Sequence, residues 1–425
     1  MRTGFEARQT FRSLRYRNYR LLWLGQTGHS AALWMDQVAR AVLILALTDS
    51  AMMLSLVIAT RLLPILLFGL LAGAVADRGD RRRILMVTQL VTFSTHLFLG
   101  VMVTFDLIAT WHVFVTALIA GTAMAFNQPV RQSLVPATVP REDLTNAVAL
   151  NSLALSTMRI GGGSFAGALL LFMDVGGVYL FTSAVYIFVI ATTWAMRFPP
   201  APERTGQRGS LFGDLGDGFA YVARNRELAL VAVLALVLFI FGFPYQQVFV
   251  PLFAKDVLEM GDSGVGFLAG ATGVGAVIGT LIVASRPSPK RPGLQLLINL
   301  AVFGAALVAM SLQATVVGTA LLLAVAGSMT VTYMAHTNTI LLSRSDPEMH
   351  GRVMSLLSLD RGLIPLGAIL AGVLVSATGV RPALFVLGAI VLVLSGLAFA
   401  LAGPRLSRIG RSQELEAQPV TAHQR

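Results

Sequence analysis

Long apolar stretches recur along the whole chain and alternate with short polar segments. A helix needs ~20 mostly apolar residues to cross the hydrocarbon core of a bilayer, and about twelve stretches reach that length. They are too long and too uniformly apolar for the ~10-residue alternating strands of an outer-membrane barrel. We therefore predict an all-α membrane protein with about twelve transmembrane helices, at roughly 19–47, 52–76, 84–105, 111–131, 144–172, 176–198, 228–254, 263–285, 293–313, 315–341, 353–378 and 381–403.

The charges fall into register with these stretches. Lys and Arg number 32 against 21 Asp and Glu, a formal net charge of +11, and such a balance suggests either nucleic acid or a membrane. Arginines crowd the N-terminal arm and every second loop, while the loops between carry mostly acids. This is the positive-inside pattern, so we expect no nucleic-acid partner and a multi-pass protein of the inner or plasma membrane with both termini cytoplasmic.

Composition also limits the chemistry. Apolar residues make up 55% of the 425 residues and charged residues only 12%, which excludes an ordinary soluble enzyme. The chain has no cysteine, and its six histidines are scattered singly, so neither a thiol site nor a metal site is expected. No Gly-x-x-x-x-Gly-Lys-Ser/Thr run is present, which argues against ATP as the direct energy source. We expect no cofactor.

A polar segment rich in proline, glycine and arginine divides the chain near its middle, with six predicted spans on each side. A weak internal repeat supports duplication, because Gly162 and Gly367 are separated by about 205 residues, as are Gly167 and Gly372. The predicted organisation is two pseudo-symmetric six-helix bundles, at 1–198 and 227–404, with a cytoplasmic linker at 199–226 and a cytoplasmic tail at 405–425. Glycine pairs four residues apart, such as Gly69 and Gly73, favour close helix packing.

The turn between the second and third spans carries six charges within seven residues, 77–83. Asp77 follows one helix and is placed to accept hydrogen bonds at a neighbouring helix N-terminus. A positive-inside turn in which the acids only solvate the loop explains the same residues equally well. The members of the candidate cytoplasmic gate are Gly73, Asp77, Arg78, Arg81, Arg82 and Arg131.

These residues resemble the signature of the major facilitator superfamily, which follows the second helix of those transporters. Asp80 stands where the general signature has glycine, as in the subgroup of drug and siderophore exporters called transmembrane secretion effectors. The segments 11–26 and 129–152 resemble the same subgroup. The resemblance implies alternating access, and it implies that Asp77 latches the two halves through Arg131 or the start of the eleventh helix. Two departures weaken proton antiport: 117–121 lacks the expected arginine, and Gly163 replaces a proline.

Ionisable residues inside the spans are costly, so each is a functional candidate. Asp36 and Arg40 lie one turn apart on the first span, and Arg61 should lie at similar depth on the second. Asp36 is the candidate proton carrier, since a partner arginine could hold it ionised in one state and leave it in another. A permanent ion pair that only sets helix packing is the equally weighted alternative. The candidate substrate cavity comprises His29, Gln37, Arg159, Tyr245, Gln246, His336, Asp360 and Arg361.

The sequence thus favours a secondary exporter, not an enzyme, that moves an amphipathic small molecule by alternating access, with exchange for protons left open. Its expected partners are that substrate, protons and the lipid bilayer, and a monomer is expected. One alternative is a lipid or lysophospholipid flippase. Another is a membrane receptor or scaffold that transports nothing, against which the charges inside the spans and the cytoplasmic motif argue.

Overall fold

The computed structural model describes residues 11–198, 211–285, 289, 291–346, 349 and 362–406. Over these residues the chain is helical and contains no strand, and ten of its helices are long and apolar enough to cross a membrane. The predicted helical membrane protein is therefore confirmed. Two further predicted spans correspond to α6 (Leu144–Leu169), which is not among the ten, and to α15 (Ile364–Thr378), which is 15 residues long.

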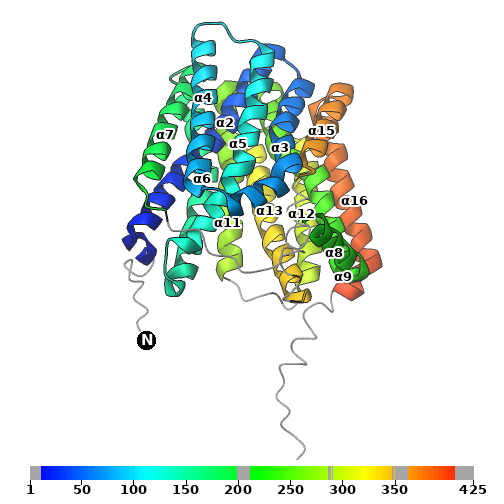
Figure 1. Ribbon diagram of the computed structural model, residues 1–425. Helices are drawn as coiled ribbons and strands as arrows, with labels where there is room; N and C mark the ends of the chain where they lie inside the picture. Colours follow the sequence, from blue (N-terminus) through cyan, green and yellow to red (C-terminus); the bar gives the residue numbers. More distant parts are fainter. Residues whose placement is uncertain are drawn as a thin grey trace, which may run out of the picture. The chain divides into compact units, whose positions relative to one another are not determined.

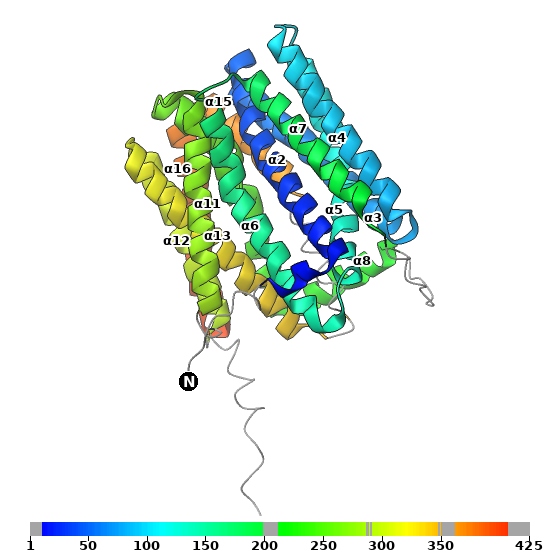
Figure 2. The ribbon, with the colours of Figure 1, turned by 90° about the vertical axis from the view of Figure 1, so that its left-hand side faces the viewer.

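The chain forms two compact units. The first comprises 1–208, 246–273 and 368–380, and the second comprises 209–245, 274–367 and 381–425. In the first unit α5 lies between α3 and α4, and α2 packs on α6 and α7 (Figures 1 and 2). Its elements from the first half of the chain are η1 (Arg12–Arg15), α2 (Arg17–Thr48), α3 (Ala51–Arg78), α4 (Arg81–Thr104), α5 (Thr110–Ala137), η2 (Arg141–Asp143), α6 and α7 (Val175–Ala195).

Short polar side chains fix the ends of these helices. Ser50 caps α3 by accepting from the Met53 amide at 3.3 Å, and Asp174 caps α7 by accepting from the Gly177 amide at 2.8 Å. Asp80 accepts from the amides of both Arg82 and Arg83 at the start of α4. The acid at the position of the signature glycine is therefore a helix cap.

Small residues allow the helices of the first unit to approach closely. A Cβ placed on Gly121 would lie 1.9 Å from the Arg61 carbonyl oxygen, so only glycine permits α5 to cross α3 there. A Cβ on Gly167 would lie 2.7 Å from the Gly266 Cα in α11 (Gly261–Ser285), whose first residues belong to this unit. For Gly69 and Gly73 no described atom lies within 4 Å of such a Cβ, so the close packing predicted for this pair stays a prediction.

The second unit packs α12 (Pro292–Leu312) against α13 (Val316–Arg344). A Cβ on Gly304 of α12 would lie 2.8 Å from the Leu392 amide nitrogen of α16 (Val380–Leu406). Residues 211–224, within the predicted linker 199–226, form the helix α8. Its apolar residues recur every three or four positions, a period that favours an amphipathic helix over a loop.

The predicted seventh span contains wide helical turns. It begins with α9 (Arg226–Val237) and continues through the π-helical segments η3 (Leu238–Gly242), η4 (Tyr245–Phe249) and η5 (Phe253–Val257), with α10 (Val250–Leu252) between the last two. Pro244 and Pro251 lack an amide hydrogen, which removes the regular α-helical bond at those positions. The boundary between the two units falls inside this region, between Tyr245 and Gln246.

Candidate functional site

A buried carboxylate lies between two guanidinium groups inside the first unit. The side chain of Asp36 on α2 is 1% exposed. Its Oδ1 atom lies 2.8 Å from Arg40 NH2, and its Oδ2 atom lies 2.8 Å from Arg61 NH1 on α3. Each carboxylate oxygen therefore has its own cationic partner, which offsets the cost of removing the charge from water.

Arg40 is held through both terminal nitrogens of its guanidinium group. NH2 donates to Asp36, while NH1 donates to the Val113 carbonyl oxygen and the Thr116 hydroxyl of α5, each at 3.2 Å. The Arg61 side chain is 14% exposed, and among the described residues its one charged partner is Asp36. Arg40 is thus fixed to α5, whereas Arg61 depends on the carboxylate of another helix.

His96 on α4 completes this cluster, and sequence reasoning missed it. Its Nε2 atom lies 3.4 Å from Asp36 Oδ1, and its Nδ1 atom lies 2.6 Å from the Thr92 carbonyl oxygen. A carbonyl oxygen only accepts, so Nδ1 carries a hydrogen and donates it. In the neutral ring, Nε2 therefore presents its lone pair toward the carboxylate, and the space between Nε2 and Oδ1 is a place where one proton can bind.

Aromatic side chains enclose the cluster. The His96 ring stacks on Tyr186 of α7, with centroids 5.5 Å apart, and contacts the Tyr179 ring at 5.9 Å. The Tyr186 hydroxyl lies 3.0 Å from His29 Nδ1, which links the predicted cavity residue His29 to the cluster. A signal for this existed in the sequence, since a lone histidine in an otherwise apolar span is as unusual as a lone acid.

An enclosed void of about 20 Å³ adjoins the cluster. One water molecule needs ~10–15 Å³, so the void has room for about one. Its polar lining comes from five helices, α2, α3, α4, α5 and α7. The lining residues are His29, Leu33, Asp36, Arg61, Thr92, His96, Ala120, Met124, Asn127 and Tyr186.

Arg131, expected as a gate residue, points into the same unit. It is buried at 5% exposure, and its Nε atom donates to Asn127 Oδ1 at 2.8 Å. Its NH2 nitrogen has no hydrogen-bond partner among the described residues. The Asn127 Nδ2 atom in turn donates to the Thr88 hydroxyl of α4 at 2.8 Å. Asn127 therefore links Arg131 to the void beside Asp36.

The other candidate residues belong to both units or lie outside the described residues. Gln37 is partly buried on α2, and Arg159 of α6 lies over the Trp34 ring at 5.4 Å from its centroid. Gln246 belongs to the first unit, whereas Tyr245, packed edge-on against Phe303, and His336, 3.2 Å from Asn299 Nδ2, belong to the second. Asp360 and Arg361 lie outside the described residues. The structure thus unites Asp36, Arg40, Arg61 and His29 in one place.

The charged turn at 77–83 is described in part. Arg82 NH2 donates to the Trp194 carbonyl oxygen at 3.2 Å, and two side-chain nitrogens of Arg81 are buried with no hydrogen-bond partner among the described residues. The side chains of Asp77 and Arg78 lie outside the described residues, so the latch stays a prediction. The described part of the chain holds no group of three or more histidine, cysteine or acidic side chains suited to a metal ion.

The chain is similar in sequence to known membrane transporters. A family profile described as "Transmembrane secretion effector" matches residues 8–421. The staphyloferrin A transporter of Staphylococcus aureus is 23% identical over 373 residues, covering 87% of this chain and 90% of that protein. Macrolide efflux protein A of Streptococcus pyogenes is 23% identical over 376 residues, covering 86% and 92%. The multidrug efflux pump Tap of Mycolicibacterium fortuitum is 25% identical over 395 residues, covering 90% and 93%.

Solved structures share the fold. The nucleoside transporter NupG superposes with a TM-score of 0.71 at 15% identity, covering 91% of this chain and 98% of that one. A bacterial homologue of the human lysosomal transporter Spinster superposes with a TM-score of 0.70 at 16% identity, covering 93% and 98%. At these identities the likeness concerns the arrangement of helices and not the ligand.

Proposed function

Because the chain belongs to the transmembrane secretion effector family, we propose that it exports an amphipathic small molecule across the cell membrane by alternating access. It is a membrane transporter and not an enzyme. Relatives are named for efflux of macrolides, for efflux of several drugs and for transport of staphyloferrin A, and these names support a small-molecule substrate. Family membership also argues against the receptor or scaffold that transports nothing.

Twelve spans in two six-helix bundles, at 1–198 and 227–404, are part of this proposal. So are cytoplasmic termini, a monomer, and a latch formed by Asp77 on the cytoplasmic side. The basic loops support the orientation, since arginine is retained on the cytoplasmic side during insertion. We also assign the predicted cavity residues of the second half to the substrate path, because polar and ionisable side chains inside apolar spans are functional candidates. These residues are Tyr245, His336, Asp360 and Arg361.

We propose that proton exchange supplies the energy for transport, and the position of Asp36 is the observation that supports this proposal. The carboxylate bridges Arg40 of its own helix and Arg61 of α3, beside a void with room for about one water. When Asp36 accepts a proton, it loses its charge and its hold on Arg61 weakens. Arg40 keeps its bonds to α5, so the change falls on the contact between α2 and α3.

Proteoliposomes with an imposed pH gradient test this role. A macrolide and staphyloferrin A serve as probes, because relatives of this chain are named for transport of these compounds. Asp36→Asn removes the titrating group and should lower gradient-driven transport at least tenfold while downhill exchange continues. Asp106→Asn is the matched control, since Asp106 is an exposed loop acid. Gradient-driven transport by Asp36→Asn at the wild-type rate would exclude Asp36 as the proton carrier.

A further inference from the structure

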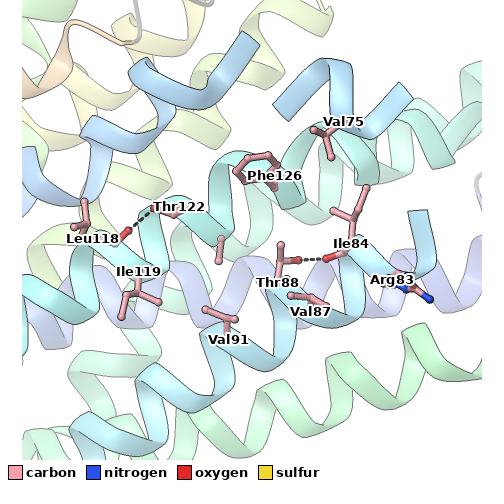
Figure 3. Close-up of a pocket in the computed structure, with 11 residues that line it drawn as sticks. Val75, Arg83, Ile84, Val87, Thr88, Val91, Leu118, Ile119, Thr122 and Phe126 are labelled. Atoms are coloured by element: carbon pink, nitrogen blue, oxygen red, sulfur yellow. Dashed lines mark hydrogen bonds between the residues drawn. The ribbon is translucent and has the colours of Figure 1, made fainter. Parts of the chain in front are cut away.

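An apolar groove lies on the surface of the first unit, and none of the residues that line it also line the void beside Asp36. Its volume is about 520 Å³, and α5 forms its floor between α4 and the end of α3 (Figure 3). Phe126, Leu118 and Ile119 come from α5, and Val87 and Val91 come from α4. Val87 is 53% exposed and Leu118 is 45% exposed, so a molecule outside the protein can reach the groove.

The groove wall offers no free hydrogen-bonding group along its length. The Thr88 hydroxyl donates to the Ile84 carbonyl oxygen at 2.8 Å, and the Thr122 hydroxyl donates to the Leu118 carbonyl oxygen at 2.8 Å (Figure 3). Both hydroxyls are therefore used within their own helices. A ligand part that lies along this wall gains by being hydrocarbon, because any polar group there would lose its water without a replacement.

One end of the groove is cationic. Arg83 stands at that end, in the first turn of α4, and Leu118 and Ile119 stand at the other (Figure 3). The Arg83 side chain is exposed, and no described residue accepts a hydrogen bond from its guanidinium group. The backbone amides of this turn are occupied by Asp80, so the guanidinium is the group available to an anion.

We propose that the groove binds one anionic phospholipid, with an acyl chain along α4 and α5 and the phosphate on Arg83. From Arg83 to Val91 the helix rises ~12 Å, enough for the upper half of an acyl chain. The cationic end belongs to the turn that the charge pattern assigns to the cytoplasmic side, where anionic headgroups are enriched and attract arginine. A mostly apolar wall with one arginine at its rim suits the acyl chain and the anionic headgroup of a phospholipid.

The groove is joined to the buried network through one side chain. Thr88 forms part of the groove wall, and its hydroxyl also accepts the hydrogen bond from Asn127 that borders the void beside Asp36. A lipid in the groove would therefore contact Thr88, the side chain that accepts the hydrogen bond from Asn127. Lipid binding does not depend on whether the protein exports anything, so a binding measurement tests it separately.

Native mass spectrometry of the full-length protein, extracted from vesicles of phosphatidylglycerol and phosphatidylcholine, measures the retained lipid. The wild-type protein should retain phosphatidylglycerol preferentially, and Arg83→Gln should lower that retention about fivefold, as expected for one arginine near a headgroup. Arg20→Gln, which removes an exposed arginine outside the groove, should have no effect. Val91→Phe, which fills the groove, should lower retention while leaving Arg83 in place.

Three results would overturn the proposal. Equal retention by Arg83→Gln and Arg20→Gln would mean that Arg83 holds no headgroup. Equal retention of both lipids by the wild-type protein would mean that the groove recognises no charge. Displacement of the lipid by a transported probe would assign the groove to substrate instead.

Discussion

The carboxylate of Asp36 and the guanidinium of Arg61 lie 2.8 Å apart although they belong to different helices. Arg40, the second partner of Asp36, is four residues away on the same helix and also bonds to α5. The pair between Asp36 and Arg61 is therefore the contact that a change in the charge of Asp36 alters most. Burying this pair also costs desolvation free energy, because both side chains are largely removed from water.

Loss of the carboxylate should be costly unless a cation is lost with it. Asp36→Ala leaves two guanidinium groups without their anion, which destabilises a protein by about 3–5 kcal/mol when the pair is buried. The thermal unfolding midpoint in detergent should fall, and Arg61→Gln added to Asp36→Ala should restore part of it. If the double variant is less stable than Asp36→Ala, the two side chains do not interact as the distances indicate.

The crossing of α3 and α5 should tolerate no side chain at Gly121. A Cβ there would lie 1.9 Å from the Arg61 carbonyl oxygen, so Gly121→Ala must push α3 away and carry Arg61 with it. We expect a loss of about 1–3 kcal/mol in stability, as for overpacked cores, and slower gradient-driven transport. Gly396→Ala is the control, since no described atom lies within 4 Å of its Cβ. A thermal midpoint for Gly121→Ala as high as that of the control would refute this.

The fold was largely predictable because lipid imposes a simple rule on sequence. Spanning helices need long apolar runs, and the ten that the structure describes as apolar enough coincide with predicted stretches. The helix α8 was missed because it lies outside any such run and its apolar face is short. Hydropathy gave no sign of the wide turns around Pro244, since it does not register how a helix closes its hydrogen bonds.

The candidate site was predictable in part, for a related reason. Asp36, Arg40 and Arg61 were found because charge is conspicuous in an apolar span. His96 and Tyr186 were missed because their role depends on which helices are neighbours, and α4 and α7 are brought together by packing that the sequence does not display. Residues Tyr245 and His336 remain predictions, since the grouping of distant polar residues cannot be read from spacing alone.

The ion pair between Asp49 and Lys255 gives a pH dependence whose sign can be worked out. Lys255 Nζ lies 2.6 Å from Asp49 Oδ1, and this hydrogen bond and charge hold the pKa of the Asp49 carboxyl below its ordinary value of 3.8. A lowered pKa in the folded state stabilises the protein above the ordinary value, and the contribution disappears as the pH falls through the lowered one. Asp49→Asn should therefore lower the thermal midpoint by the same small amount from pH 5 to pH 8.

Below the ordinary pKa the two proteins should converge. The comparison is made against Asp106→Asn, an exposed acid with no ion pair among the described residues. A difference between wild type and Asp49→Asn that grew on acidification, or one that changed between pH 5 and pH 8, would show that another group controls the pH dependence.

His96 should matter for proton exchange and not for the fold. Its Nδ1 hydrogen is committed to the Thr92 carbonyl oxygen, so Nε2 is the ring atom that can share a proton with Asp36 Oδ1 across 3.4 Å. A glutamine at this position keeps a donor and an acceptor but cannot titrate, so His96→Gln should slow gradient-driven transport and flatten its dependence on pH. Downhill exchange should persist, because the ion pairs of Asp36 with its two arginines are retained. His112→Gln serves as the control, since a glutamine can still accept the hydrogen bond from the Ala109 amide at the start of α5. An unchanged pH profile for His96→Gln would leave Asp36 without this partner in proton transfer.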